Sequence, residues 1–258
     1  MKKPLLILFC LPLLFGCANK TQENETIEQG NGWKLEKQVT KKADNFHFTF
    51  PSLGYAYDNG IRTLDSAEAY GNAHEIIGIF HDKNPAKIFN IITKLPKVIN
   101  YDIIDRVNGY LKDLKVDHLE TLMFHSFDSY HDNLNNFDSL RKLKSNRRIK
   151  NLGVSVYTNN EIEQVISNKD IDVIQLPFNL FDNANFRGDI LQKAKIKGKI
   201  IHTRSALLQG LFFKEKNASD EIVQKLKNEL TFLSSISKRE GMSISEMALS
   251  YCMQQKTF

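Results

Sequence analysis

The sequence predicts an α/β fold in which helices alternate with parallel strands, in the form of an incomplete (β/α)8 barrel. Three observations predict it. Strand-like runs and helix patterns alternate along the body of the chain, and polar residues close successive strands about every thirty residues. The length of 258 residues also suits one domain of this type, which typically needs about 250 residues.

Six strand-like runs are short, rich in apolar or β-branched residues, and end in a polar or turn-forming residue. They are 61–65, 89–94, 119–125, 151–155, 171–177 and 199–203. Helix patterns separate them at 73–81, 101–113, 136–146, 159–167 and 187–197. This alternation is typical of a parallel sheet covered by helices. A doubly wound open sheet is the alternative, although no G-x-G-x-x-G turn follows any strand.

The two ends of the predicted barrel differ from its middle. A closed barrel needs eight strand–helix units, and six are recognisable. FHFTF at 46–50 is a candidate for a degenerate first strand, followed by a short helix (SLGYAYDNG) that Gly60 ends. Residues 243–255 form an amphipathic helix pattern after a serine cap, and no strand pattern follows. We therefore expect a barrel over 46–258, truncated at its C-terminus, with unpaired strand edges.

Composition and cysteine usage exclude several classes of protein. The chain is 41% hydrophobic and 25% charged, with a net charge of +5 and no dense Lys/Arg stripe interleaved with aromatic residues, so nucleic acid is not an expected partner. Cys10 and Cys17 lie in an apolar leader and leave Cys252 alone in the body, which excludes a disulfide framework. No Cys/His spacing resembles a zinc site, and we expect no metal.

Residues 1–17 have the pattern of a targeting signal. Two lysines precede an apolar stretch that is too short to span a bilayer, where a helix needs about 20 residues. LFGC at 14–17 resembles the lipobox of bacterial lipoproteins, in which the cysteine, here Cys17, receives the lipid. A buried first strand or an uncleaved anchor is the alternative. Residues 18–45 are polar and predict a tether. We expect a membrane-anchored lipoprotein facing outside the cytoplasm.

Four polar residues close or follow the predicted strands on one face. Asp65, Lys94 and His125 end successive strands, and Tyr70 lies in the loop after Asp65. A lysine ammonium lowers the pKa of a nearby tyrosine from about 10, and Asp65 can hold the lysine. A histidine can orient a carbonyl group. Singly, each residue has an ordinary interpretation as a cap, a packing residue or a solvated charge; together they predict a general-acid site for carbonyl reduction.

At this point a family resemblance becomes specific. GIRTLDSAEAYGNAHEIIG at 60–78 closely resembles the signature of the aldo/keto reductase family. FNIITKLP and LKDLKVDHLETLMFHSFD resemble the segments that carry the family's lysine and histidine, and IKNLGVSVYTNNEIEQV, IDVIQLPFNLFD and HTRSALLQGLF resemble later segments. The resemblance covers roughly 52–255. It implies a (β/α)8 barrel that transfers a hydride from NADPH to an aldehyde or ketone without a metal.

The resemblance also implies roles for single residues. Tyr70 would donate the proton, Lys94 would lower its pKa, Asp65 would pair with Lys94, and His125 would orient the substrate carbonyl. The residues implied in cofactor binding are Ser155 and Gln175 at the nicotinamide carboxamide, Arg204 at the nicotinamide ring, and Ser205, Leu207 and Gln209 in the pyrophosphate loop.

The sequence departs from the family pattern at several places. Val156 stands where many relatives have asparagine, and the last strand and helix, whose segment grips the adenosine 2′-phosphate, are not recognisable. An exported chain would also reach a compartment without free NADPH. The alternative function is therefore a membrane-anchored, non-catalytic barrel remnant, either a binding protein or a truncated product, and the alternative location is the cytoplasm. The substrate, the choice between NADPH and NADH, and the oligomeric state are not readable from the sequence.

Overall fold

The computed structural model describes residues 7–9, 25–30, 33–37, 45–213 and 221–255. Side chains are described from residue 52 onward. Cys17, the predicted lipidation site, lies outside these ranges, and so does most of the predicted leader.

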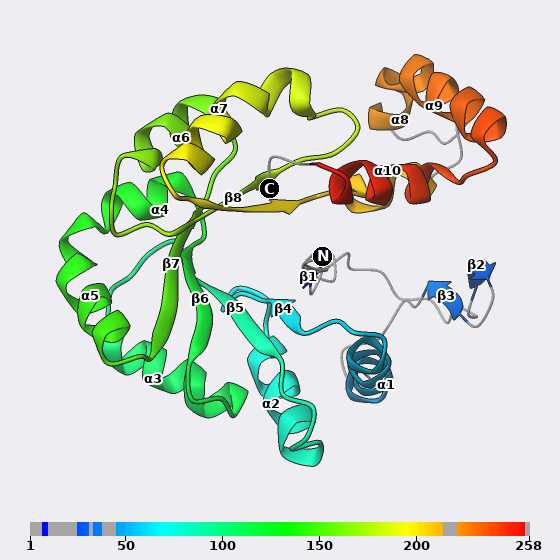
Figure 1. The fold of residues 1–258 in the computed structure, drawn as a ribbon. Coiled ribbons are helices and arrows are strands. Elements are labelled where there is room, and N and C mark those ends of the chain that lie inside the picture. Colours follow the sequence, from blue (N-terminus) through cyan, green and yellow to red (C-terminus); the bar gives the residue numbers. More distant parts are fainter. Residues whose placement is uncertain (1–6, 10–24, 31–32, 38–44, 214–220, 256–258) are drawn as a thin grey trace.

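Six parallel strands form a curled half-barrel (Figure 1). They are β4 (Thr63–Asp65), β5 (Asn90–Leu95), β6 (Leu119–Phe124), β7 (Ile149–Ser155), β8 (Val173–Pro177) and β9 (Ile200–Arg204). Each strand pairs with the next one in the sequence, without the reversal of order that a doubly wound sheet requires. The predicted fold, an incomplete (β/α)8 barrel with six strand–helix units, is confirmed.

A short strand, β1 (Ile7–Phe9), pairs in parallel with β4 in the register Ile7 to Thr63. It occupies the place beside β4 that a first barrel strand takes. If the leader were a buried first strand, which is the alternative to a targeting signal, it would lie at this position beside β4. The assignment of residues 1–17 as a lipoprotein signal stays a prediction.

Helices cover the outer face of the half-barrel, where Figure 1 shows them as a curved outer layer. They are α2 (Ala73–Lys83), α3 (Ile103–Leu114), α4 (Phe127–Asp132), α5 (Phe137–Ser145), α6 (Asn159–Ile166) and α7 (Ala184–Ile196). Capping residues define where two of them start. At α3, the Asp102 carboxylate accepts hydrogen bonds from the Ile104 and Asp105 amides, and at α6, Thr158 forms a capping box with Glu161. The five predicted helices between the strands are confirmed.

The expected first strand at 46–50 is wrong, because that segment belongs to helix α1 (Asn45–Asp58). Leu53 and Ala56 are buried, and the Tyr57 ring packs edge-on against Phe89 with 5.1 Å between ring centroids. This spacing of three and four residues matches a helix that lies on the core, and it outweighs the short alternation of phenylalanines at 46–50. Gly60, with φ +91°, follows the helix, as predicted.

The chain after β9 forms a small helical extension. It contains a kinked 3-10 segment, η2 (Leu208–Phe213), then α8 (Glu221–Lys225), α9 (Lys227–Glu240) and the predicted α10 (Ile244–Met253). Ser243 and Glu246 form the capping box that starts α10. The Tyr251 ring stacks on Phe178 at 5.5 Å, and its hydroxyl accepts the Ala184 amide at 3.0 Å, which docks α10 beside the loop after β8.

Two further strands lie near the N-terminus. Strands β2 (Glu25–Gly30) and β3 (Trp33–Lys37) form an antiparallel pair inside the segment predicted as a polar tether (Figure 1). The role of that segment as a tether stays a prediction. None of the described helices combines the length and hydrophobicity needed to cross a membrane.

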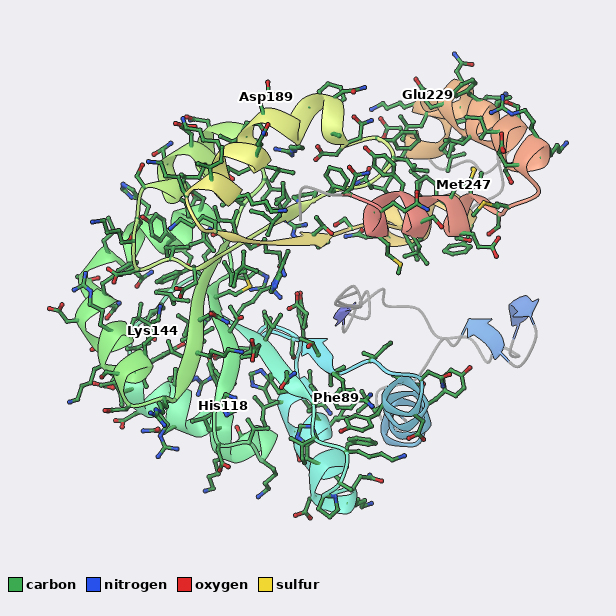
Figure 2. All side chains as sticks on the ribbon, viewed as in Figure 1. Phe89, His118, Lys144, Asp189, Glu229 and Met247 are labelled. Carbon is green, nitrogen blue, oxygen red and sulfur yellow. The ribbon has the colours of Figure 1, made fainter. Side chains whose placement is uncertain are left out.

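The core has an outer and an inner part. The main cluster lies between the sheet and the outer helices, where Phe89 fills the space between α1 and the start of β5 (Figure 2). A smaller cluster of Ile92, Met123 and Val173 comes from the opposite face of β5, β6 and β8. The alternation along each strand therefore places Asp65, Lys94 and Gln175 on this inner face as well.

Helices α2 and α3 touch at Gly78. A Cβ atom at this position would lie 1.8 Å from the Asp113 carbonyl oxygen, which is part of the α3 backbone. In contrast, a Cβ at Gly109 in α3 would meet nothing within 4 Å.

We predict that Gly78→Ala lowers the free energy of unfolding by about 1–3 kcal/mol or more, because the methyl group forces the two helices apart. Urea unfolding followed by circular dichroism measures this. Gly109→Ala is the matched control and is expected to raise stability by about 1 kcal/mol through helix propensity. Equal effects of the two substitutions would contradict the close approach at Gly78.

Candidate active site

A buried ion pair lies where β4 and β5 end. Lys94 Nζ is paired with Asp65 Oδ1 and also donates to the Ser66 carbonyl oxygen at 3.0 Å. The second carboxylate oxygen, Asp65 Oδ2, accepts from Gln175 Nε2 at 2.7 Å. Asp65 is 0% exposed and Lys94 3%. A buried pair is tolerated when further hydrogen bonds satisfy both groups, and this one has them.

Tyr70 and His125 lie beside this pair. The Lys94 ammonium is 5.6 Å from the centroid of the Tyr70 ring. The Tyr70 and His125 rings meet edge-on, with 6.1 Å between centroids and 85° between planes. A tight turn from Ala67 to Gly71, whose φ is +64°, positions Tyr70: the Tyr70 amide donates to the Ala67 carbonyl at 3.0 Å. The structure thus brings the four predicted catalytic residues together.

The environment keeps the His125 imidazole neutral. Burial lowers its pKa, and the nearby charges of Lys94 and Arg204 lower it further, against the opposing charge of Asp65. A neutral imidazole donates one hydrogen bond through its N–H group and is not an acid at neutral pH. Its position beside Tyr70 suits it to hold an oxygen atom in place.

The predicted cofactor residues end the next strands of the half-barrel. Ser155 is buried at the end of β7, and Gln175 is buried within β8. Arg204, at the end of β9, stacks on the Tyr157 ring at 4.3 Å and donates to the Ser205 hydroxyl at 3.4 Å.

The loop after β9 has an unusual backbone. Ser205, Leu208 and Gln209 all have positive φ values of 62°, 48° and 53°, followed by Gly210 at 86°. Leu207 lies within this loop and is half-buried. Non-glycine residues with positive φ are uncommon and often lie at ligand-binding loops.

Several buried polar atoms at this end of the strands have no hydrogen-bond partner in the described part of the chain. They are Ser66 Oγ, Gln175 Oε1 and Arg204 Nη2. Buried polar atoms are normally satisfied, so these atoms point to a polar ligand or water. The acceptor oxygen of Gln175 fits the amide N–H groups of a nicotinamide carboxamide, and the planar Arg204 guanidinium fits the face of a nicotinamide ring. Within the described ranges, no group of His, Cys, Asp and Glu side chains is arranged to hold a metal ion.

Comparison with known proteins identifies the family. Residues 30–258 match the aldo/keto reductase family. The chain belongs to this family. No curated protein sequence matches it.

Solved aldo/keto reductases share the fold. A putative aldo-keto reductase from Pseudomonas aeruginosa is 21% identical, with a TM-score of 0.54 over 83% of this chain and 84% of that chain. An aldo/keto reductase from Klebsiella pneumoniae, solved with NADP and acetate, is 15% identical, with a TM-score of 0.62 over 83% and 73%. A glycerol dehydrogenase from Gluconobacter oxydans is 21% identical, with a TM-score of 0.62 over 81% and 73%.

The departure from the aldo/keto reductase pattern at Val156 has a structural counterpart. Val156 is fully buried in the main core cluster, and its amide donates to the Gln175 carbonyl at 2.8 Å. The side chain therefore packs in the core, while the backbone holds the strand that carries Gln175.

Two features near the site were missed in the sequence. His202 on β9 is buried, and its Nδ1 atom has no partner in the described part of the chain. It lies two residues before Arg204, so the period of a strand places it on the same inner face, and this alternation could have revealed it. The second feature is a group of donors around Glu68, which no sequence pattern indicated because they come from α3 and from the turn before it, after the next strand.

Four histidines share a depressed pKa. Burial is the largest cause for His74, His81, His125 and His202, and it lowers the pKa of His74 to about 4. The neutral His74 ring forms a hydrogen bond of 2.7 Å between Nε2 and the Thr93 hydroxyl. The His81 ring forms one of 2.8 Å between Nδ1 and the Leu114 carbonyl oxygen. Because an unfolded histidine has a pKa of about 6.5, the unfolded chain binds more protons than the folded chain below that pH.

We predict that the stability contributed by these neutral histidines is fully present above about pH 7 and decreases as the pH falls below about 6.5, for His74 down to about pH 4. Each histidine lowers the free energy of unfolding by at most about 1.4 kcal/mol per pH unit in this range. Urea unfolding at pH 7.5, 6.0 and 5.0 measures the slope. His74→Gln should reduce it, whereas His131→Gln, at an exposed side chain, should leave it unchanged. A wild-type free energy of unfolding that stays constant down to pH 5 would contradict the burial of these histidines.

Proposed function

We propose that this chain is an oxidoreductase that reduces an aldehyde or ketone by hydride transfer from NADPH, with Tyr70 as the general acid. One observation carries the proposal: Tyr70 and His125 lie beside a buried Asp65–Lys94 pair at the C-terminal ends of the strands. Active sites of barrel enzymes lie at this end. Membership of the aldo/keto reductase family supports the same chemistry.

Each residue has a separate task in the proposed reaction. The Asp65 carboxylate holds the Lys94 ammonium near the Tyr70 phenol, where the positive charge favours the phenolate that remains after proton transfer. Tyr70 gives its proton to the carbonyl oxygen as that oxygen gains negative charge. The neutral His125 ring donates a hydrogen bond to the same oxygen and fixes its position. NADPH, when bound, supplies the hydride to the carbonyl carbon.

The proposed cofactor site uses the residues at the ends of β7, β8 and β9. Ser155 and the free acceptor oxygen of Gln175 would hold the carboxamide, and Arg204 would lie against the nicotinamide ring. The loop of Ser205, Leu207 and Gln209 would hold the pyrophosphate. The Klebsiella pneumoniae neighbour, whose structure contains NADP, supports a nicotinamide cofactor here.

We predict that Tyr70→Phe lowers kcat by about 100-fold or more and leaves NADPH binding within about twofold, because a general acid contributes 10²–10⁴ to the rate. Steady-state reduction of an aldehyde panel and NADPH titration, followed by nicotinamide fluorescence, measure both quantities. Tyr55→Phe is the matched control at an exposed tyrosine.

Unchanged turnover in Tyr70→Phe would remove the assigned acid. Failure of the folded wild-type chain to bind NADPH would favour the alternative of an anchored, non-catalytic barrel.

We also propose that Cys17 carries a lipid that anchors the chain to a membrane, facing outside the cytoplasm. The charged start of the leader, the short apolar stretch and LFGC support this location. A cytoplasmic location, which the NADPH requirement favours, is the alternative.

We predict that metabolic labelling with a fatty-acid analogue marks the wild-type chain and that Cys17→Ser abolishes the label. Cys252→Ser is the control, since Cys252 is a partly buried thiol packed near the Phe178 carbonyl, and it should keep the label. Label that persists in Cys17→Ser would exclude the lipoprotein assignment.

A further inference from the structure

We propose that Glu68 is a positioning residue that fastens the loop bearing Tyr70 to helix α3. Glu68 lies two residues before Tyr70, in the loop between β4 and α2. Its carboxylate accepts hydrogen bonds from α3 and from the turn before α3, and we call this set of contacts the clamp. This inference rests on the proposed role of Tyr70, because a clamp on its loop matters for chemistry only if Tyr70 takes part in it.

The side chain of Glu68 accepts from three residues. Arg106 donates through Nε to Oε2 at 3.1 Å and through Nη2 to Oε1, so its guanidinium grips both carboxylate oxygens. Tyr110 and Tyr101 donate their hydroxyls to Oε2, the latter at 3.4 Å. Arg106 and Tyr110 are four residues apart on α3 and therefore share one face of the helix.

The backbone of Glu68 is fixed from the opposite direction. Its amide donates to the Lys94 carbonyl oxygen on β5 at 3.1 Å. The Lys94 side chain in turn donates to the Ser66 carbonyl at 3.0 Å, and the Ser66 amide donates to Ile92 at 2.8 Å. One residue thus joins the loop to β5 through its main chain and to α3 through its side chain. Tyr70 follows two residues later, so both attachments restrict its position.

The charges keep this clamp intact at physiological pH. Burial opposes the charged form of Glu68, but the hydrogen bonds from Arg106 and Tyr110 outweigh it and hold the pKa of the carboxyl below its usual value. Burial and the adjacent carboxylate raise the pKa of Tyr110 and of Tyr101, so both stay protonated donors. The Arg106 guanidinium also lies over the rings of Tyr101 and Tyr110, at 5.2 and 5.6 Å.

The ion pair between Arg141 and Asp170 resembles the one between Arg106 and Glu68 but lies away from the Tyr70 loop, so it offers a matched control. The Asp170 carboxylate accepts hydrogen bonds from Arg141 Nε at 3.1 Å and from Arg141 Nη2 at 2.7 Å. The side chain of Asp170 is 29% exposed and that of Glu68 is 22% exposed. Asp170 precedes β8, at the end of the strands opposite the site, so its loss removes a comparable pair and leaves the Tyr70 loop untouched.

The kinetic test uses the full chain with NADPH and a model aldehyde. We expect Glu68→Ala to lower kcat by about 10- to 100-fold, since a misplacement of about 1 Å can cost 10²-fold, while KM and the NADPH Kd stay within about twofold. Glu68→Gln keeps an acceptor oxygen and is expected to recover part of kcat. Asp170→Ala should leave kcat unchanged. In a Tyr70→Phe background, Glu68→Ala should cause no further loss, and an added tenfold loss there would overturn the proposal.

A second measurement does not depend on activity. Hydrogen exchange of the 66–72 segment should speed up about tenfold or more in Glu68→Ala and remain unchanged in Asp170→Ala, because the clamp limits local opening. Unchanged exchange in Glu68→Ala would overturn the proposal. If the wild-type chain reduces no carbonyl compound, the proposed function fails by itself, and the exchange result alone decides whether Glu68 holds this loop.

Discussion

The buried charge of Asp65 is the constraint on which the rest of the site depends. A carboxylate removed from water costs several kcal/mol unless every oxygen finds a donor, and here Lys94 satisfies one oxygen and Gln175 the other. Strands β4, β5 and β8 must therefore be in a register that brings these three side chains to the same level of the sheet. The parallel register provides this, because it pairs Asp65 with Ile92 and Ser155 with Gln175. Because Asp65 fixes the ammonium of Lys94, it also fixes the electrostatic environment of the Tyr70 phenol.

The sheet geometry explains how loops of different origin meet at one place. Strands that run in parallel bring all their C-terminal ends to the same edge, and each supplies one polar side chain above an inner layer of Ile92, Met123 and Val173. The outer helices cover the other face with apolar side chains, while the inner face combines this small apolar layer with the polar groups of the site. Most of the packing thus lies on the face opposite the site, and the polar side chains that could carry chemistry lie at the strand ends.

The sequence was sufficient for the elements whose signals are local. Six strands and the helices between them follow from periodicity and caps, and the juxtaposition of Asp65, Tyr70, Lys94 and His125 follows from parallel strands of similar length. It failed at 46–50, where an alternation of five residues was outweighed by the helical burial of Leu53 and Ala56. The Glu68 contacts were out of reach, because Arg106 lies 38 residues away and only the packing of α3 brings it close.

The order of the strands has a consequence for how the molecule assembles. Each of β5 to β9 pairs with the strand before it through contacts that span 20 to 30 residues, so the sheet can assemble by adding one strand–helix unit at a time. The bond between Gln175 and Asp65 is different, since it joins residues 110 positions apart. The Asp65 carboxylate therefore lacks its second donor until β8 has joined the sheet. The site is therefore complete only after this long-range contact between the first and fifth strands of the half-barrel has formed.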